Sequence, residues 1–399
     1  MNRPLFFINA GHALDHLSML IFPTALLGMA AGFGTDYSAL IALAIGGTIA
    51  FGAGSLPAGW LGDHWSRHGM MLVFFFGLGA ALIATSFAQT HWQLAVGLTA
   101  VGLAAAIYHP VGLALLPQVA GTAGKVLGVN GVWGNMGVAA AALSTGFLTQ
   151  QFGWRVAFWV PGLVSILMGI AFALLVQPLP KAPKKAKPMP AGLDKATVVR
   201  AFGILLAVTI AGGVVFTAAT LTLPKLVSER IGPTISALGG GTFGIGGIAA
   251  IIYASGALAQ LTVGWALDRF SLSKVFAAIA AFQVPSLLLV ALGQGHWLIL
   301  AVVGVMIAIF GQVTVNDAMV NRYTDATWRG RIHAIRYLFS FGASAVAVPL
   351  IAFSHKHWDG FASLFLILAV LGGVVFIGAL ACPRDRRAGE GGAVEGAKA

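Results

Sequence analysis

The sequence predicts an all-α membrane protein with twelve transmembrane helices in two pseudo-symmetric six-helix bundles. Three observations support this fold class. First, 58% of the 399 residues are hydrophobic and only 9% are charged, whereas a soluble domain carries about 25% charged residues. Second, apolar runs of about 20 residues, the length of a spanning helix, recur between short polar breaks. Third, motifs of the first half return in the second half at one fixed spacing, which indicates a duplicated unit.

The expected spans follow the apolar runs in chain order. We place them at residues 5–31, 38–60, 70–89, 93–118, 126–149, 156–176, 200–223, 237–263, 275–293, 297–320, 332–354 and 360–381. The first run contains His12, Asp15 and His16 and lacks a small-residue cleavage site, so we expect a retained helix and no cleaved signal peptide. The 53 glycines suit helices that pack closely in lipid.

The distribution of Lys and Arg predicts the orientation. Most of the 23 basic residues fall on the side of the two termini. The opposite side holds only Arg155, Lys225, Arg230 and Lys356. Because cytoplasmic loops carry the excess of Lys and Arg, we expect both termini in the cytoplasm and the helices in a bacterial inner membrane. Basic residues in these loops explain the net charge of +11, so no nucleic-acid partner is expected.

Composition also divides the chain into four parts. The stretch from 177 to 197 is rich in Pro and Lys and is expected to be an extended cytoplasmic linker. It separates an N-terminal six-helix bundle, 1–176, from a C-terminal one, 198–381. The remaining residues, 382–399, are rich in Gly and charge and are predicted to be a disordered cytoplasmic tail.

The internal repeat has two landmarks with the same spacing. Gly59-Trp60-Leu61-Gly62-Asp63 returns as Gly264-Trp265-Ala266-Leu267-Asp268, so Asp63 and Asp268 stand 205 residues apart. His91-Trp92 returns as His296-Trp297 at the same spacing of 205. Repeats of this kind place a substrate site near the membrane midplane, between the halves.

The stretch from Gly59 to Arg67 resembles the loop 2–3 signature of the major facilitator superfamily, G-x-L-x-D-x-x-G-R. It keeps Gly59, Leu61, Asp63 and Arg67 and departs at Ser66. A degenerate copy follows at 264–274. The resemblance implies the superfamily fold and a conformational lock formed by Asp63, Arg67 and Asp268, in which the loop carboxylate meets the positive N-terminus of a neighbouring helix.

Three shorter motifs look like the fosmidomycin-resistance branch of drug exporters. They are Gly11-His12-Ala13-Leu14-Asp15, Tyr108-His109-Pro110 and Gly134-Asn135-Met136-Gly137. This resemblance implies proton-coupled export of a small polar or amphipathic compound. The run Ala139–Ala142 departs from the family, since drug antiporters commonly carry a Gly-Pro pair there, and the direction of transport stays open.

Placing an ionisable residue within a membrane span costs free energy, so such residues are functional candidates by default. His12, Asp15 and His16 share one face of the first span, and we expect them to couple protons or bind substrate. An interhelical hydrogen-bond cluster is the alternative. A metal site is not predicted: the ligand types are suitable, but no second cluster completes a shell.

His109 precedes Pro110, which removes a backbone hydrogen bond and kinks a helix. His109 is expected to contact proton or substrate, or else to satisfy the freed carbonyl. Asp317 and Arg336 are expected to form a gate at the cytoplasmic mouth. Alternatively, Arg336 holds an anionic substrate, or the pair supports the fold. Further candidates for cavity lining are Asn130, Asn135, Tyr108, Phe339 and Phe341, the two asparagines lying on a ridge formed by Gly128, Gly131, Gly134 and Gly137.

Nothing in the sequence indicates an enzyme. No Walker-type loop is present, and Gly239–Gly241 lacks the strand that a phosphate cradle needs. No catalytic residue, metal or cofactor is predicted. The expected protein is a monomeric secondary transporter whose partners are a small-molecule substrate, protons and membrane lipids. Proton-coupled antiport is preferred. Import or facilitated transport of a small organic anion is the first alternative, and a non-transporting receptor is the second.

Overall fold

The computed structural model describes residues 3–120, 124–178, 195–293, 295, 297–324, 329–358 and 360–383. All regular structure in this part of the chain is helical. The helices are α1 Arg3–Phe33, α2 Tyr37–Ala42, α3 Ala44–His64, α4 Arg67–Ser86, α5 His91–Ala105, α6 Tyr108–Ala120, α7 Gly124–Phe152, α8 Trp154–Leu175, α9 Lys195–Ala237, α10 Gly241–Leu267, α11 Leu272–Leu292, α12 Trp297–Tyr323, α13 Arg329–His357 and α14 Phe361–Ala381.

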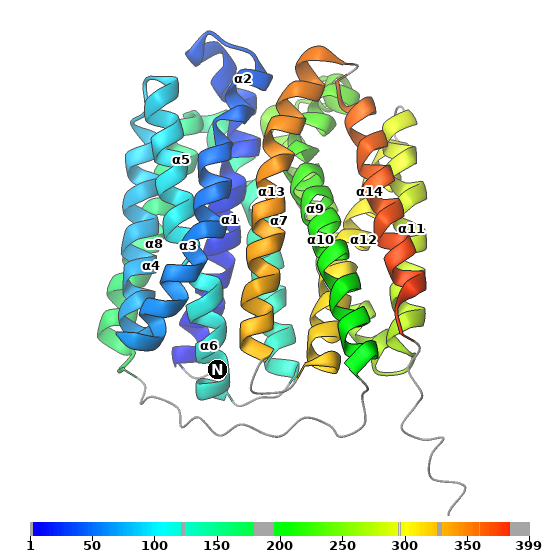
Figure 1. Ribbon diagram of the computed structural model, residues 1–399. Helices are drawn as coiled ribbons and strands as arrows, with labels where there is room; N and C mark the ends of the chain where they lie inside the picture. The colour runs from blue at the N-terminus through cyan, green and yellow to red at the C-terminus, as the bar shows by residue number, and fades with distance from the viewer. Residues whose placement is uncertain are drawn as a thin grey trace, which may run out of the picture.

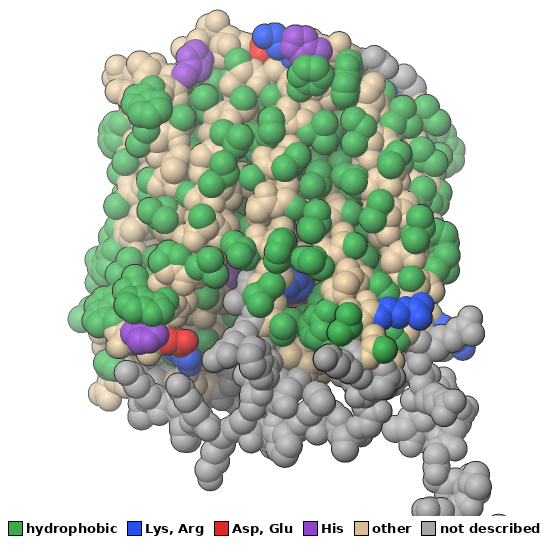
Figure 2. Space-filling view, viewed as in Figure 1, with side chains coloured by type: hydrophobic (Ala, Val, Ile, Leu, Met, Phe, Trp, Pro, Cys, Tyr) green, Lys and Arg blue, Asp and Glu red, His purple; other side chains and the backbone are tan. Residues whose placement is uncertain are grey.

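Helices α1–α8 form one bundle and α9–α14 form a second bundle beside it (Figure 1). The start of α1 and the end of α14 lie at the same end of the molecule, and α2 lies at the other end. On the face shown in Figure 2, apolar side chains form a broad belt, and most of the charged side chains lie toward the two ends. The predicted all-α membrane fold is therefore confirmed.

Eleven helical segments in the described ranges are long and apolar enough to cross a membrane. The one predicted span that is not among these eleven is the fifth, 126–149. It corresponds to α7, which is 29 residues long but carries more polar side chains. It packs closely against α1 of its own half and α10 of the other half. Because these two helices cover part of its surface, α7 needs less apolar surface than a helix that mainly faces lipid.

Two predicted spans are each divided into two helices. The second span becomes α2 and α3, and the fourth becomes α5 and α6, with the break just before Tyr108. Pro110 explains the second break, because it has no N–H to donate to the carbonyl of Ala106 four residues earlier. The hydroxyl of Ser55 on α3 lies 3.3 Å from that carbonyl and 2.9 Å from the carbonyl of Phe51, so its single proton is shared between the two. Ser55 thus partly satisfies the freed carbonyl.

The seventh predicted span is too short. It was placed at 200–223, but α9 runs from Lys195 to Ala237 and includes Pro224 and Pro233. The charged residues after Leu223 indicated the end of an apolar run, whereas the helix itself continues beyond that run. Most of the predicted linker, 177–197, and of the predicted tail, 382–399, falls outside the described residues.

Several pairs of helices join the two halves, chiefly α7 with α10, α13 with both α2 and α3, and α1 with α9. Glycines permit the closest of these contacts, since a Cβ at Gly146 would lie 2.8 Å from the carbonyl oxygen of Thr242. The predicted glycine ridge on α7 is only partly a packing surface. Gly134 and Gly137 meet α1, whereas Gly128 has open space beside it.

Candidate functional site

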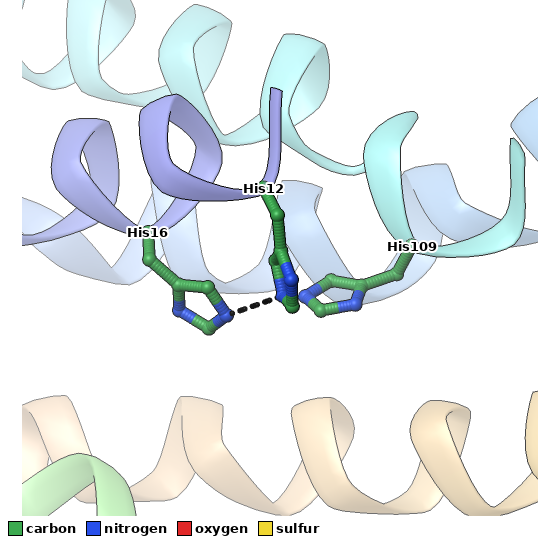
Figure 3. A group of neighbouring side chains, drawn as sticks. All are labelled: His12, His16 and His109. Carbon is green, nitrogen blue, oxygen red and sulfur yellow. Dashed lines mark hydrogen bonds between the residues drawn. The ribbon is translucent and has the colours of Figure 1, made fainter. Parts of the chain in front are cut away.

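Three histidines and one aspartate form a cluster beside the boundary between the halves. His12, Asp15 and His16 come from α1, and His109 comes from the first turn of α6. The three imidazole rings project toward one another and toward the ribbon of α13 (Figure 3). The ring centroids of His12 and His109 lie 5.4 Å apart, and those of His16 and His109 lie 5.5 Å apart. The structure thus brings together the four residues that the sequence proposed for proton or substrate contact.

His12 is held in one orientation. Its Nδ1 lies 2.8 Å from the carbonyl oxygen of Asn130, which can only accept, so Nδ1 donates. Its ring stacks on Tyr108 with 4.8 Å between centroids. With the proton on Nδ1, the lone pair resides on Nε2, and this Nε2 lies 3.1 Å from Nε2 of His16. The His12 lone pair therefore points into the cluster.

A buried network of hydrogen bonds around Asn130 stabilises this orientation of His12. The Asn130 amide donates to Oδ1 of Asn9 and to the hydroxyl of Tyr108, both at 2.9 Å. The Tyr108 hydroxyl in turn donates to the carbonyl of Ile8 at 2.9 Å. These bonds tie α1, α6 and α7 together, so Asn130 and Tyr108 position the cluster.

Asp15 is fully buried, with 0% exposure. Its Oδ2 lies 3.3 Å from Nε2 of His109, whose side chain is 11% exposed. A buried carboxylate is costly unless a positive group or a proton compensates its charge. The imidazole of His109 is the group that can compensate the Asp15 carboxylate at this distance.

Aromatic side chains from both halves cover the cluster. Phe51 on α3 and Phe341 on α13 are in edge contact at 4.6 Å. Each lies near the His109 ring, at 6.0 and 6.1 Å respectively. Phe341 is thus a direct contact between the C-terminal half and the histidine cluster. Phe339 is 41% exposed and lies on a different side of α13.

Asp317 and Arg336 meet as an ion pair between α12 and α13, in which Arg336 Nη2 donates to Asp317 Oδ1. Arg336 is buried at 6% exposure, while the Asp317 side chain is 40% exposed. Both residues belong to the C-terminal half, so the pair fastens two helices of one bundle. Its predicted role as a gate stays a prediction.

The remaining predicted residues lie outside the histidine cluster. Asp63 accepts a hydrogen bond of 2.7 Å from Arg67, and Arg67 also donates to the carbonyl of Ala114 at 3.2 Å. Asp268 is the exposed C-cap residue of α10. Asn135 donates to Gln260 at 2.6 Å, which joins α7 to α10 across the halves.

Sequence reasoning missed a second polar cluster, at the α2 end. The hydroxyl of Ser38 on α2 lies 3.0 Å from Nδ1 of His355 on α13, and the other ring nitrogen of His355 lies 2.8 Å from Glu229 on α9. Lys225 also pairs with Glu229, at 3.2 Å. We call these four residues the outer cluster. The scarcity of acidic residues, 12 in the chain, was the one signal that could have drawn attention to Glu229.

Comparison with known proteins agrees with this architecture. The sequence model of the family described as Major Facilitator Superfamily matches residues 8–259 and 245–398. A probable transporter of Streptomyces coelicolor is 27% identical over 242 residues, 59% of this chain and 54% of that protein. The puromycin resistance protein of Streptomyces alboniger is 30% identical over 131 residues, 32% of this chain and 26% of that protein. The chain thus matches about half the length of the first relative and less of the second.

A solved structure shows the same fold over nearly the whole chain. The crystal structure of the nucleoside transporter NupG superposes with a TM-score of 0.73 and covers 95% of this chain and 100% of that one. The sequence identity is 14%, so this likeness concerns the fold alone.

Proposed function

Because the chain belongs to the Major Facilitator Superfamily, we propose that this integral membrane solute transporter is a proton-coupled antiporter. It exports a small polar or amphipathic compound by alternating access, in which two halves rock around a central site. The family is one of transporters, which excludes an enzyme. The protein is placed in a bacterial inner membrane with both termini in the cytoplasm. We also propose that the chain belongs to the fosmidomycin-resistance branch of drug exporters.

The contact between Asp15 and His109 carries the proposal. The Asp15 carboxylate is fully buried, and its Oδ2 lies 3.3 Å from His109 Nε2. In the proposed mechanism the carboxylate and the imidazole share one proton, which belongs to the pair and not to either residue alone. When the proton leaves, a buried negative charge remains, and water or substrate must compensate it. Proton release is thereby linked to opening of the site.

Phe341 supplies a link between the proton pair and the other half. It contacts Phe51 at 4.6 Å and lies 6.1 Å from His109. A movement of α13 away from α3 separates these rings and exposes His109. Protons therefore have different affinities for the open and closed arrangements, as coupling by population shift requires.

The direction of transport is supported by one relative. The puromycin resistance protein matches 131 residues of this chain, and resistance to a compound agrees with export. The alternative is import or facilitated transport of a small organic anion, favoured by the buried guanidinium of Arg336. Flux of one compound under pH gradients of opposite sign separates the two directions.

The experiment that tests proton coupling begins with a thermal-shift screen of purified protein against candidate compounds at two pH values, since a ligand stabilises the state that binds it. The compound found is then followed in proteoliposomes with an imposed pH gradient. Asp15→Asn is expected to reduce gradient-driven flux to the level of empty liposomes while the protein stays folded.

The matched control is Asp36→Asn. Asp36 is the N-cap of α2 and lies outside the cluster, and Asn caps helices as well as Asp does. Its flux should equal that of the wild type. Gradient-driven flux that is undiminished in Asp15→Asn would refute the assignment.

A further inference from the structure

We propose that His12, His16 and His109 bind a divalent transition-metal ion of the zinc class, with the Asp15 carboxylate beside them compensating its charge. The sequence offered two histidines and a carboxylate, which do not complete a coordination shell. The fold adds His109 from α6 as a third imidazole. One ring nitrogen from each of the three histidines lies within 4.8 Å of the other two.

The spacing of the nitrogens suits a tetrahedral ion. Zinc binds histidine nitrogen at about 2.0–2.1 Å, so two ligands in tetrahedral geometry stand about 3.3 Å apart. The Nε2 atoms of His12 and His16 are 3.1 Å apart. Their positions at i and i+4 on one helix place both rings on the same side. Only His109 needs to approach, through a small rotation of its side chain.

The protonation of His12 also suits a metal, whereas His16 Nε2, which donates to His12 Nε2 in this structure, gives up its proton when an ion binds. A histidine that binds metal usually donates its other ring N–H to a carbonyl or carboxylate, which fixes the tautomer and the ring orientation. His12 has this arrangement, because Nδ1 donates to the Asn130 carbonyl at 2.8 Å and leaves the lone pair on Nε2. Tyr108 and Gly134 hold the same ring from its two sides.

The donor set selects the class of ion. Imidazole nitrogen suits zinc, copper, nickel and iron, whereas calcium and magnesium require oxygen ligands. Three neutral imidazoles do not offset the charge of a divalent ion. The Asp15 carboxylate lies 3.3 Å from His109 Nε2 and supplies one negative charge, either as a fourth ligand or beside the third.

The site is enclosed but reachable. His12 and Asp15 are buried, whereas His16 and His109 are each partly exposed. A metal ion entering along the boundary between the halves meets His16 and His109 first. Because the ligand nitrogens must be free of protons, the metal and the transported proton compete for the same cluster.

Binding is tested on the purified full-length protein in detergent, produced with an affinity tag that contains no histidine and stripped of metal by a chelator. The probe is cobalt chloride, because tetrahedral cobalt gives intense visible absorption and zinc displaces it. We expect one cobalt per chain, displacement by one equivalent of zinc, and complete loss of the absorption in His16→Ala and in His109→Ala. Asp15→Asn should weaken binding by roughly 10- to 100-fold.

The control is His91→Ala, which should leave the titration unchanged. His91 is exposed and lies against Phe33 at the end of α1, away from the cluster. His16→Gln, which keeps a polar side chain of similar size, serves as a second variant if His16→Ala does not fold. Absence of tetrahedral absorption in the wild type, or an equal titration in folded variants of His16 and His109, would overturn the proposal. The titration needs no gradient or substrate, so its failure leaves proton coupling intact, and a failure of coupling leaves metal binding intact.

Discussion

The ring of His12 lies directly against the bare backbone of Gly134: a Cβ at Gly134 would stand 2.7 Å from Cε1 of His12. Distances under about 3 Å require one partner to move. Because the other face of His12 stacks on Tyr108, the ring cannot move without disturbing the cluster. Glycine at position 134 is therefore part of the site.

Gly134→Ala is expected to lower the stability of the folded protein by about 1–3 kcal/mol, the usual cost of overpacking, and to impair proton-coupled flux. Thermal unfolding in detergent measures the first effect. Gly128→Ala is the matched control on the same helix, since a Cβ there meets none of the described residues within 4 Å. Alanine is the better helix former, so that variant should gain about 0.5–1 kcal/mol. Equal unfolding temperatures for the two variants would contradict the role of Gly134.

The network behind His12 should behave as one unit. Tyr108→Phe removes the hydroxyl that accepts from Asn130 and donates to Ile8. Asn130→Ala removes the other partner of the same bond. Each change is expected to cost about 1–3 kcal/mol, because buried groups lose their hydrogen bonds.

The double variant of Tyr108 and Asn130 should be less destabilised than the sum of the two single effects. A double-mutant cycle based on unfolding in detergent provides the measurement. Strictly additive losses would show that the two side chains act independently and that the network does not position His12.

The sequence was sufficient to predict the bundles and much of the cluster. Apolar runs determine where helices cross lipid, and the spacing of His12, Asp15 and His16 places them on one helix. The pairing of Asp15 with His109 depends on how α1 packs against α6. His109 was nevertheless singled out, because an ionisable group beside Pro110 in an apolar run needs an explanation.

The outer cluster was not predicted, for a physical reason. Hydropathy identifies the lipid-facing part of a helix, and this part of α9 ends before Lys225. Glu229 was therefore assigned to a loop, although α9 continues to Ala237. Glu229 contacts His355 on α13, and His355 contacts Ser38 on α2, so only the assembled fold brings the three residues together.

One substitution in the Arg336–Asp317 pair separates anion binding by Arg336 from a role of the pair in the fold or in a gate. Arg336→Lys keeps the positive charge but removes the planar guanidinium, which matters where a carboxylate or phosphonate binds in two contacts. If the pair supports the fold or forms a gate, Lys should preserve substrate affinity. If Arg336 binds an anion, the KM for that anion should rise about tenfold or more while the unfolding temperature stays close to that of the wild type.

A companion substitution, Asp317→Asn, shows whether the pair stabilises the fold. It removes the negative charge that Arg336 contacts, which is destabilising for a guanidinium at 6% exposure. An unfolding temperature equal to that of the wild type would show that α12 and α13 do not depend on the pair.

The outer cluster should hold the α2 end of the transporter closed. Ser38 belongs to the N-terminal half, and His355 and Glu229 belong to the C-terminal half. Glu229 orients His355 and Lys225, which contact Ser38 and the ring of Tyr37 on α2 across the halves. Glu229→Gln should therefore loosen these two contacts between the halves. Contacts of this kind contribute up to about 1 kcal/mol, so the ratio of open to closed molecules at this end should rise by up to about fivefold.

Spin labels at the two sides of this contact measure the change. The single cysteine, Cys382, is first replaced by Ser, and labels are attached through Ala39→Cys on α2 and Phe353→Cys on α13, both exposed positions. The distance distribution should gain a longer component in Glu229→Gln. Arg155→Gln is the control, because Arg155 lies at the same end but bonds within the N-terminal half, to the carbonyl of Ala88. An identical distribution in wild type and Glu229→Gln would mean that apolar packing alone closes this end.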